Sequence, residues 1–382
     1  MDSIYLDHAA ATPIRPEVSA AMATLRDRFG NPSSVHRWGR EARVALEDAR
    51  ERTAAILLTG PQQVHFVRGG TESINLAILG RVEWAQSHGQ GSPRLFRSSL
   101  EHPAVREAME AAALMGSVVE VIPISPEGEL ALPDEKELRA QAAQLVSVQW
   151  VNQETGLILP IPQVADICRK AGVSLHVDAV QAAGKIPLEL DRTPVALLSL
   201  SGHKLGGPRS TGVLVIAEGT EIQARLFGGG QEQNIRPGTE DVAGAVGFTR
   251  ALELSVRNLE EEATRLIALR RRLEIGLQSR LPGLQIHGAE GARAPHILSL
   301  GIPDLPRDIL PSALDLAGIG VSAGSACRSG SVSVSPILKA LYGSDVENIA
   351  PLRLSLGWST TQGEVDETIR RIPPIIEQMW NA

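Results

Sequence analysis

Cysteine is scarce in this 382-residue chain, which contains only Cys168 and Cys327. Two cysteines so far apart form neither a CxxC pair nor a disulfide framework, so a reducing compartment is expected. Long apolar runs are also missing, because none approaches the roughly 20 apolar residues of a membrane span. The N-terminal MDSIYLDHAA has neither the basic nor the apolar region of a signal peptide. We therefore expect a cytoplasmic protein without a membrane partner.

An excess of positive charge is missing as well, since the chain has 37 Lys and Arg residues but 44 Asp and Glu residues, which gives a net charge of −7. Without a basic patch, direct binding of nucleic acid is not expected, and small molecules are the favoured partners. The chain also lacks an HExxH or paired Cys/His spacing, a GxSxG elbow and a Walker loop. No metal site of its own is therefore predicted.

The chain does contain an alternation of short apolar runs with helical patterns, which predicts an α/β fold with a mainly parallel sheet. Several runs are apolar throughout, as expected where helices cover both faces of the sheet. The predicted strands are QVHFV (63–67), RLFRSS (94–99), SVVEVIPI (117–124), QLVSVQWV (144–151), VSLHVDAV (173–180) and PVALLSLS (194–201).

A long helical pattern rich in Leu, Ala, Glu and Arg follows at residues 240–281 and is interpreted as a bridge into a smaller α+β domain. Beyond it, strand patterns alternate with helical ones. The strand patterns are 294–303, 319–324 and 352–358, and the helical patterns are 308–318 and 335–343.

Ligands of open α/β sheets gather at the carboxyl ends of strands, so the residues that follow each strand are candidates for a site. RGGTES, residues 68–73, follows the first predicted strand and opens a helix. Backbone N–H groups and the helix dipole favour a phosphate there. The same residues also fit a plain turn with Thr71 or Ser73 as a helix cap.

An acid and an amide follow two further strands. Asp178 ends a central predicted strand, and NQETG, residues 152–156, follows the strand before it. One interpretation of Asp178 is a helix N-cap. The other is a charged partner for a protonated pyridine nitrogen.

Lys204 is one of only five lysines and follows the predicted strand 194–201. Most lysines are solvated surface charges. A partly buried lysine, however, has a lowered pKa and can form a Schiff base. Lys185 is the competitor, but it lies between a helical stretch and Pro187. The strand ends thus supply a phosphate cradle, an amide, an acid and a lysine, a set that pyridoxal 5′-phosphate would use together.

Histidine offers one candidate for this site. His102 follows a strand and precedes Pro103, which suits the first turn of a helix, so its ring is placed to stack on a pyridine. His176 and His296 lie in apolar strands and are expected to be core residues.

With these residues assembled, the chain resembles the cysteine desulfurases of the NifS/IscS type, in the class-V aminotransferase family of fold-type I pyridoxal-phosphate enzymes. The resemblance implies a large cofactor-binding domain of residues 14–257. It also implies a small domain of residues 1–13 and 258–382 that carries a mobile cysteine loop at about 321–335. The motifs that carry it are YLDHAAATP, FGNPSSVHRWG, RGGTESINLAI, EHPAV, NQETG, HVDAVQAAGKIPL, SLSGHKLGGPRSTG, GGGQEQNIRPGT, GSACRSGS and LRLSLG.

The resemblance also implies the roles of individual residues. Lys204 would bind the cofactor as a Schiff base and move protons, Asp178 would hold the pyridine nitrogen protonated, and His102 would stack on the ring. Arg353 would bind the substrate carboxylate, with Asn152 beside it. The remaining cofactor contacts would be Gly70, Thr71, Ser201 and His203 at the phosphate, Asn152 and Gln181 near the ring oxygen, and Thr239 reaching the phosphate of a second subunit in a homodimer.

The implied reaction converts L-cysteine to L-alanine and leaves the sulfur on Cys327 as a persulfide for an acceptor protein, such as an iron–sulfur scaffold, in cluster assembly or tRNA thiolation. Cys327 lies among glycines and serines in VSAGSACRSGS, residues 321–331. Such a loop suits a thiol that visits both cofactor and acceptor and contacts a cluster during transfer. An inert loop cysteine is the alternative.

Three features depart from the family pattern. Arg68 stands where Ser is common, NQE replaces NNE, and the chain ends at IIEQMWNA, so docking of a scaffold through a C-terminal tail is in doubt. The alternatives to a desulfurase are a selenocysteine lyase or an aminotransferase of the same fold, or a non-catalytic partner in sulfur assembly.

Overall fold

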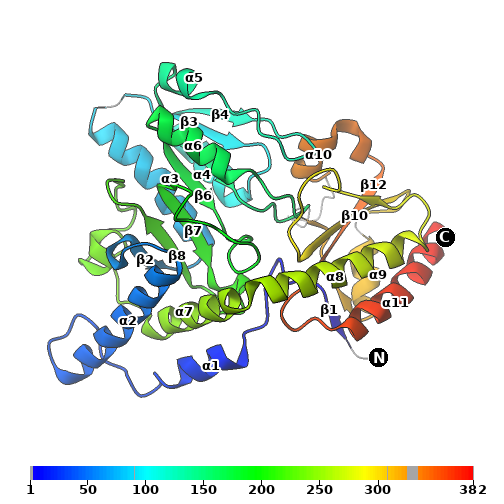
Figure 1. Ribbon diagram of the computed structural model, residues 1–382, viewed down its shortest axis with the longest axis horizontal. Coiled ribbons are helices and arrows are strands. Elements are labelled where there is room, and N and C mark those ends of the chain that lie inside the picture. The colour runs from blue at the N-terminus through cyan, green and yellow to red at the C-terminus, as the bar shows by residue number, and fades with distance from the viewer. Residues whose placement is uncertain (1–2, 90, 308, 325–333, 382) are drawn as a thin grey trace.

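The computed structural model describes residues 3–89, 91–307, 309–324 and 334–381. A seven-stranded sheet forms the larger part of it, with strand order β2-β8-β7-β6-β5-β3-β4 (Figure 1). Only β8 runs antiparallel to its neighbours. The predicted α/β fold is thus confirmed. The strands are β2 (Val64–Val67), β3 (Arg94–Ser98), β4 (Val118–Ile122), β5 (Ala143–Gln149), β6 (Ser174–Asp178), β7 (Leu197–Ser201) and β8 (Gly212–Ile216).

Helices cover both faces of this sheet, which explains why its central strands are apolar throughout. The apolar sides of α3 (Gly70–Ser87) and α4 (Pro103–Leu114) are buried on one face. Those of α6 (Ile161–Ala171) and α7 (Val242–Arg257) are buried on the other. The remaining helices of this part are α1 (Pro16–Ala23) and α2 (Arg37–Ile56), which pack on α7, and α5 (Glu135–Ala140), which packs on α6.

A second, antiparallel sheet of order β12-β10-β9 has its own hydrophobic core. The helical pattern of residues 240–281 divides at Asn258 into α7 and α8, and α8 extends toward this second sheet (Figure 1). The elements here are α8 (Leu259–Gln278), β9 (Gln285–Ile286), β10 (Ile297–Pro303), α9 (Ile309–Leu316), α10 (Pro336–Tyr342), β12 (Ile349–Ser355) and α11 (Gln362–Trp380).

The N-terminal segment, residues 3–12, connects the two sheets. Its strand β1 (Ile4–Tyr5) pairs in parallel with β11 (Ile319–Gly320) beside the second sheet. Farther on, the Thr12 N–H donates to the carbonyl of His203 in the larger part, at 2.9 Å. The chain therefore passes between the two parts at its start as well as at α8. Among the described residues, no helix is both long enough and apolar enough to cross a membrane.

Candidate active site

A cavity of about 430 Å³ lies at the carboxyl ends of β5, β6 and β7, beside the first turns of α3 and α4. This is the edge at which a parallel sheet binds ligands. Its lining contains nine of the predicted site residues. They are Gly70, Thr71, His102, Asp178, Gln181, Ser201, His203, Lys204 and Arg353.

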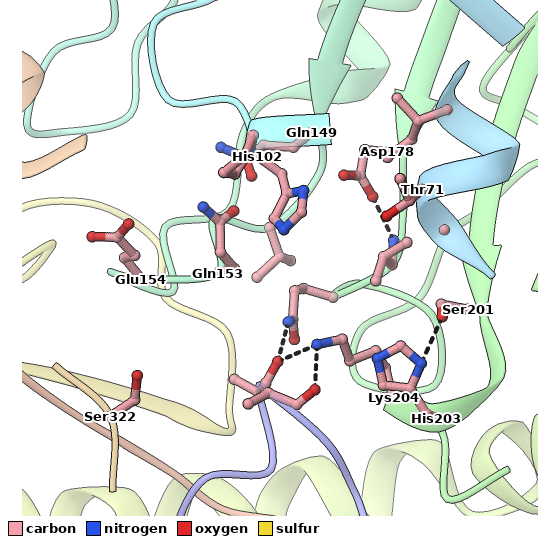
Figure 2. A pocket seen from close by; sticks show the side chains of 18 of the residues that line it. Thr71, His102, Gln149, Gln153, Glu154, Asp178, Ser201, His203, Lys204 and Ser322 are labelled. Carbon is pink, nitrogen blue, oxygen red and sulfur yellow. Dashed lines mark hydrogen bonds between the residues drawn. The ribbon is translucent and has the colours of Figure 1, made fainter. Parts of the chain in front are cut away.

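Lys204 reaches the cavity from the short 3-10 helix η2 (Gly202–Lys204), directly after β7. Its Nζ donates to the carbonyl oxygens of Ala9, at 2.6 Å, and Ala10, at 2.7 Å (Figure 2). Burial and then the positive charge of Arg353 lower the pKa of Lys204 to about 8. A substantial fraction of the amine is therefore neutral near pH 7.5, which a nucleophilic lysine requires.

Asp178 is the last residue of β6 and is 6% exposed. Its Oδ1 accepts the backbone N–H of Val180 at 3.0 Å, so it does act locally as a turn acceptor. Burial raises its pKa to about 6, against the opposing effects of the Val180 N–H and the Lys204 charge. Because that value is below neutral pH, a buried negative charge faces the cavity.

The first turn of α3 and the end of β7 form one side of the cavity. Gly69, which precedes α3, has φ +101°, a backbone conformation that favours glycine. Opposite, the Oγ of Ser201 and the Nδ1 of His203 are 3.0 Å apart (Figure 2). Thr71 adds a hydroxyl from α3. Helix N–H groups and hydroxyls together provide donors for an anion.

His203 on this side is neutral. Burial, and after it the charges of Lys204 and Arg209, lower its pKa to about 4. At neutral pH its ring therefore contributes one N–H donor and one acceptor.

His102 is the N-cap of α4. Its Nδ1 accepts the backbone N–H of Ala104 at 3.1 Å, which orients the ring. Figure 2 shows this ring pointing into the cavity, on the side where Asp178 lies.

The two predicted amides differ in their surroundings. Gln181 lines the cavity, where its Nε2 donates to the Ala9 carbonyl at 2.8 Å and its Oε1 lies 3.3 Å from the Nε2 of His296. Asn152 is fully buried and is not among the lining residues. Its Oδ1 accepts the backbone N–H groups of Glu154 and Thr155, so it shapes the turn after β5.

Arg353 enters from β12 of the second sheet and is 7% exposed. Its Nη2 donates to the Oδ1 of Asp7 at 2.7 Å, and its Nη1 donates to the carbonyl of Gln153 at 2.8 Å. Its Nε is buried and has no hydrogen-bond partner among the described residues. On the side supplied by the second sheet, the cavity is therefore lined by a guanidinium that is already held at two of its nitrogens.

Thr239 and Cys327 are not part of this arrangement. Thr239 is exposed, beyond the 3-10 helix η3 (Gln231–Asn234), and does not line the cavity. Cys327 lies outside the described residues. Cys168 is a buried free thiol on α6, and burial raises its pKa to about 12.

Lys185, the lysine that competed with Lys204 in the sequence, does not line the cavity. His176 and His296 are buried, as predicted. His176 Nδ1 lies 2.8 Å from the Oγ of Ser147 and its Nε2 2.9 Å from the Oγ of Ser199, which satisfies both ring nitrogens.

Several lining residues were not predicted. Ala9 and Ala10 belong to the YLDHAAATP motif and act through their carbonyls, for which side-chain chemistry gives no signal. Gln153 and Glu154 stand in the NQETG motif, which the sequence did single out. The other unpredicted lining residues are Ile74, Pro103, Gln149, Val151, Val180, Ser322 and Gly324.

The residues present fit pyridoxal 5′-phosphate. A lysine of lowered pKa and a buried acid face one cavity, and an N–H-rich helix start lies at its side. Gly70 at this helix start packs closely against the neighbouring turn, because a Cβ there would lie 2.9 Å from the Cγ2 of Val180. Thr71, Ser201 and His203 would hold the phosphate, Asp178 would face the ring nitrogen, and Lys204 would bind the aldehyde carbon.

Known proteins are similar to this chain over nearly its whole length. The class-V aminotransferase family model matches residues 4–368. A relative named cysteine desulfurase IscS from Dictyoglomus turgidum is 36% identical, over 98% of this chain and 95% of its own. One named cysteine desulfurase NifS from Azotobacter vinelandii is 35% identical, over 100% of this chain and 94% of its own.

A solved structure titled NifS-like protein is also similar. It has a TM-score of 0.89 and 32% identity, with 98% of this chain and 100% of that chain covered. The chain belongs to the class-V aminotransferase family, whose cofactor is pyridoxal 5′-phosphate.

Proposed function

We propose that the chain is a cysteine desulfurase that converts L-cysteine to L-alanine and transfers the sulfur atom to Cys327. The net step is balanced: L-cysteine and the Cys327 thiol give L-alanine and a Cys327 persulfide. The substrate Cβ–Sγ bond breaks, a sulfur–sulfur bond forms, and the substrate Cβ is reduced as the transferred sulfur is oxidised. The observation that carries the proposal is the convergence of Lys204, Asp178 and Arg353 on one cavity.

When bound, pyridoxal 5′-phosphate supplies an electron sink for the charge that develops at the substrate Cα. Asp178 keeps the ring nitrogen protonated, since its buried carboxylate is ionised above a pKa of about 6. His102 stacks on the ring, held in orientation by its bond to the Ala104 N–H.

Lys204 moves the proton of the substrate Cα. Its pKa of about 8 makes the Nζ a usable base near neutral pH, because a general base works best when its pKa lies near the operating pH. The carbonyls of Ala9 and Ala10 accept the hydrogen atoms of the Nζ when the amine is free.

Arg353 binds the carboxylate of the substrate and thereby fixes the amino acid in the cavity. Its guanidinium is a permanent charge with planar donor geometry, which suits a carboxylate. The place of Arg353 in the cavity lining, opposite the side that carries Asp178, Ser201 and Lys204, supports this role.

Cys327 accepts the sulfur, and Cys168 does not. A thiol must ionise to act as the nucleophile, and the pKa of about 12 of Cys168 together with its burial prevents this.

The active unit is proposed to be a homodimer in which Thr239 reaches the cofactor phosphate of the neighbouring subunit. The exposure of Thr239 supports this. In this proposal, residues 14–257 form the cofactor-binding domain, and residues 1–13 and 258–382 form the small domain. The acceptor is a protein such as an iron–sulfur scaffold, and the scarcity of cysteine supports the cytoplasm as the location.

The test is incubation of the purified holoenzyme with L-cysteine and a reductant, with alanine and sulfide measured together. Equal amounts of both are expected. Lys204→Ala should lose the covalently attached cofactor. Cys327→Ala should keep the cofactor absorbance and lose sulfide release, whereas the matched control Cys168→Ala should keep both.

Three results would contradict the assignment. Sulfide release at the wild-type rate by Cys327→Ala would remove Cys327 from the mechanism. Alanine formed only with a keto acid would identify an aminotransferase, and activity on selenocysteine but hardly on cysteine would identify a selenocysteine lyase.

A further inference from the structure

The N-terminal segment, residues 3–12, touches three of the proposed functional side chains. The carbonyl of Ala9 accepts both the Nζ of Lys204, at 2.6 Å, and the Nε2 of Gln181, at 2.8 Å. Asp7 of the same segment forms a 2.7 Å ion pair with the Nη2 of Arg353. The YLDHAAATP motif is therefore part of the wall of the site.

This segment is bonded both to β12 and across itself. The Ala9 N–H donates to the Oγ of Ser355 at 2.8 Å, two residues along β12 from Arg353. The Tyr5 hydroxyl donates to the Ala11 carbonyl at 2.7 Å. The backbone that carries Asp7 is consequently fixed relative to the strand that carries Arg353.

The Arg353 guanidinium is restrained at two of its three nitrogens. Asp7 holds Nη2 through one carboxylate oxygen, and the Gln153 carbonyl holds Nη1 at 2.8 Å. The pair is shielded, with the Arg353 side chain 8% and the Asp7 side chain 21% exposed. Each Nη carries a second N–H in the plane that the two bonds define, and neither of these makes a bond within the described residues.

We propose that Asp7 is a positioning residue that orients the Arg353 guanidinium so that its free donors meet the carboxylate of the amino-acid substrate. A carboxylate binds a guanidinium best when the two groups share a plane, and a charge-assisted bond to Asp7 restricts rotation of that plane. The inference rests on the proposed role of Arg353 in substrate binding.

The opposite role for Asp7 would be competition with the substrate carboxylate for the Arg353 guanidinium. A carboxylate 2.7 Å from the guanidinium could also weaken its attraction for a second carboxylate. The two roles predict changes of opposite sign: loss of Asp7 weakens carboxylate binding if Asp7 positions Arg353, and strengthens it if Asp7 competes.

The test measures the binding of L-alanine and ethylamine to the holoenzyme by titrating the cofactor absorbance. These two amines differ only in the carboxylate, so the ratio of their dissociation constants reports the contribution of Arg353. Asp7→Ala should weaken alanine about tenfold, because a misaligned guanidinium loses much of a bidentate bond. Ethylamine should stay within about twofold, since it makes no such bond.

Asp7→Asn supplies the conservative rescue. Its amide oxygen can accept the same bond from Nη2, so alanine should bind within about threefold of wild type. Asp48→Ala is the matched control, because Asp48 is an exposed aspartate paired with Arg52 on α2. If Asp7→Ala does not fold, Asp7→Ser replaces it, because the short serine side chain cannot reach the Nη2 of Arg353.

The outcomes separate this inference from the proposed function. Wild-type protein that does not distinguish alanine from ethylamine, or Arg353→Leu that still does, overturns the role of Arg353 and Asp7 together. If Arg353→Leu loses the preference while Asp7→Ala keeps it, only the role of Asp7 is overturned. Equal weakening of both ligands by Asp7→Ala, or tighter alanine binding by both Asp7 variants, also overturns it.

Discussion

The ion pair between Arg50 and Glu232 gives a direct test of how the fold holds the loop before Thr239. Arg50 Nη1 lies 2.7 Å from Glu232 Oε2, and Nη2 lies 2.9 Å from Oε1. Only 6% and 2% of the two side chains are exposed. The Phe66 N–H also donates to Glu232 Oε2 at 2.9 Å. Both charges are thus buried and bonded.

The backbone at this pair is strained. Glu232, Gln233 and Asn234 have φ of 47°, 57° and 66°, a left-handed backbone conformation that residues other than glycine adopt at a cost in free energy. We infer that the Arg50 pair holds this turn, from which the chain continues to Thr239.

The substitution Glu232→Gln keeps the size of the side chain and leaves Arg50 charged, buried and incompletely paired. Removing one partner of a buried pair costs about 3–5 kcal/mol of unfolding free energy. The control is Glu253→Gln, which breaks pairs with Arg52 and Arg250, whose side chains are 41% and 27% exposed. Such a pair contributes about 0–1 kcal/mol. The free energy of unfolding is compared by urea titration at one protein and cofactor concentration.

The double variant Arg50→Met with Glu232→Gln provides a second check, since it removes the unpaired charge. It should be more stable than Glu232→Gln alone. If Glu232→Gln lowers the unfolding free energy no more than Glu253→Gln does, the pair is not the anchor of the turn. If Arg50→Met gives no recovery, the unpaired charge is not the cause.

Three further predictions concern the site and its surroundings. Reaction of the cofactor-free chain with pyridoxal 5′-phosphate needs a neutral Lys204, whose pKa burial and the Arg353 charge lower to about 8. The reaction rate should therefore rise with pH and level off above about pH 8. A rate that still rises past about pH 10 would refute this. Iodoacetamide at pH 8 should leave Cys168 unmodified until the chain is unfolded, because burial raises its pKa to about 12, and peptide mass spectrometry of the native chain would reveal any exception. Gly70→Ala should weaken cofactor binding about tenfold in equilibrium dialysis, since overpacking would displace Val180. The control Gly363→Ala, in the first turn of α11 with open space around it, should leave the affinity unchanged. Equal affinities of the two variants for the cofactor would contradict the predicted crowding at Gly70.

Much of the larger sheet could be predicted from the sequence. Runs of four to seven residues rich in apolar side chains mark β2 to β7, and β5 and β7 are almost wholly buried because helices cover both faces of the sheet. The antiparallel strand β8 was missed, since a single short run gives no indication of its direction. The break of the long helical pattern at Asn258 was also missed, because no glycine or proline stands at that point of the sequence.

The chemistry at the strand ends was predictable for a geometric reason. Parallel strands bring their carboxyl ends to one edge, so Asp178 and Lys204, which follow β6 and β7, must approach each other whatever the details of packing. Residue type then indicated their chemistry. The sequence by itself therefore determined the fold class, the edge of the sheet that binds the ligand, and the main acid and amine of the site.

Tertiary structure decided how those groups are tuned and held. Lys204 meets the Ala9 carbonyl across 195 positions of sequence, and Asp7 meets Arg353 across 346. Such pairs depend on how the N-terminal segment and the second sheet pack against the first, which no local pattern encodes. The lowered pKa of Lys204 likewise depends on burial, a property of the folded chain and not of any residue within it.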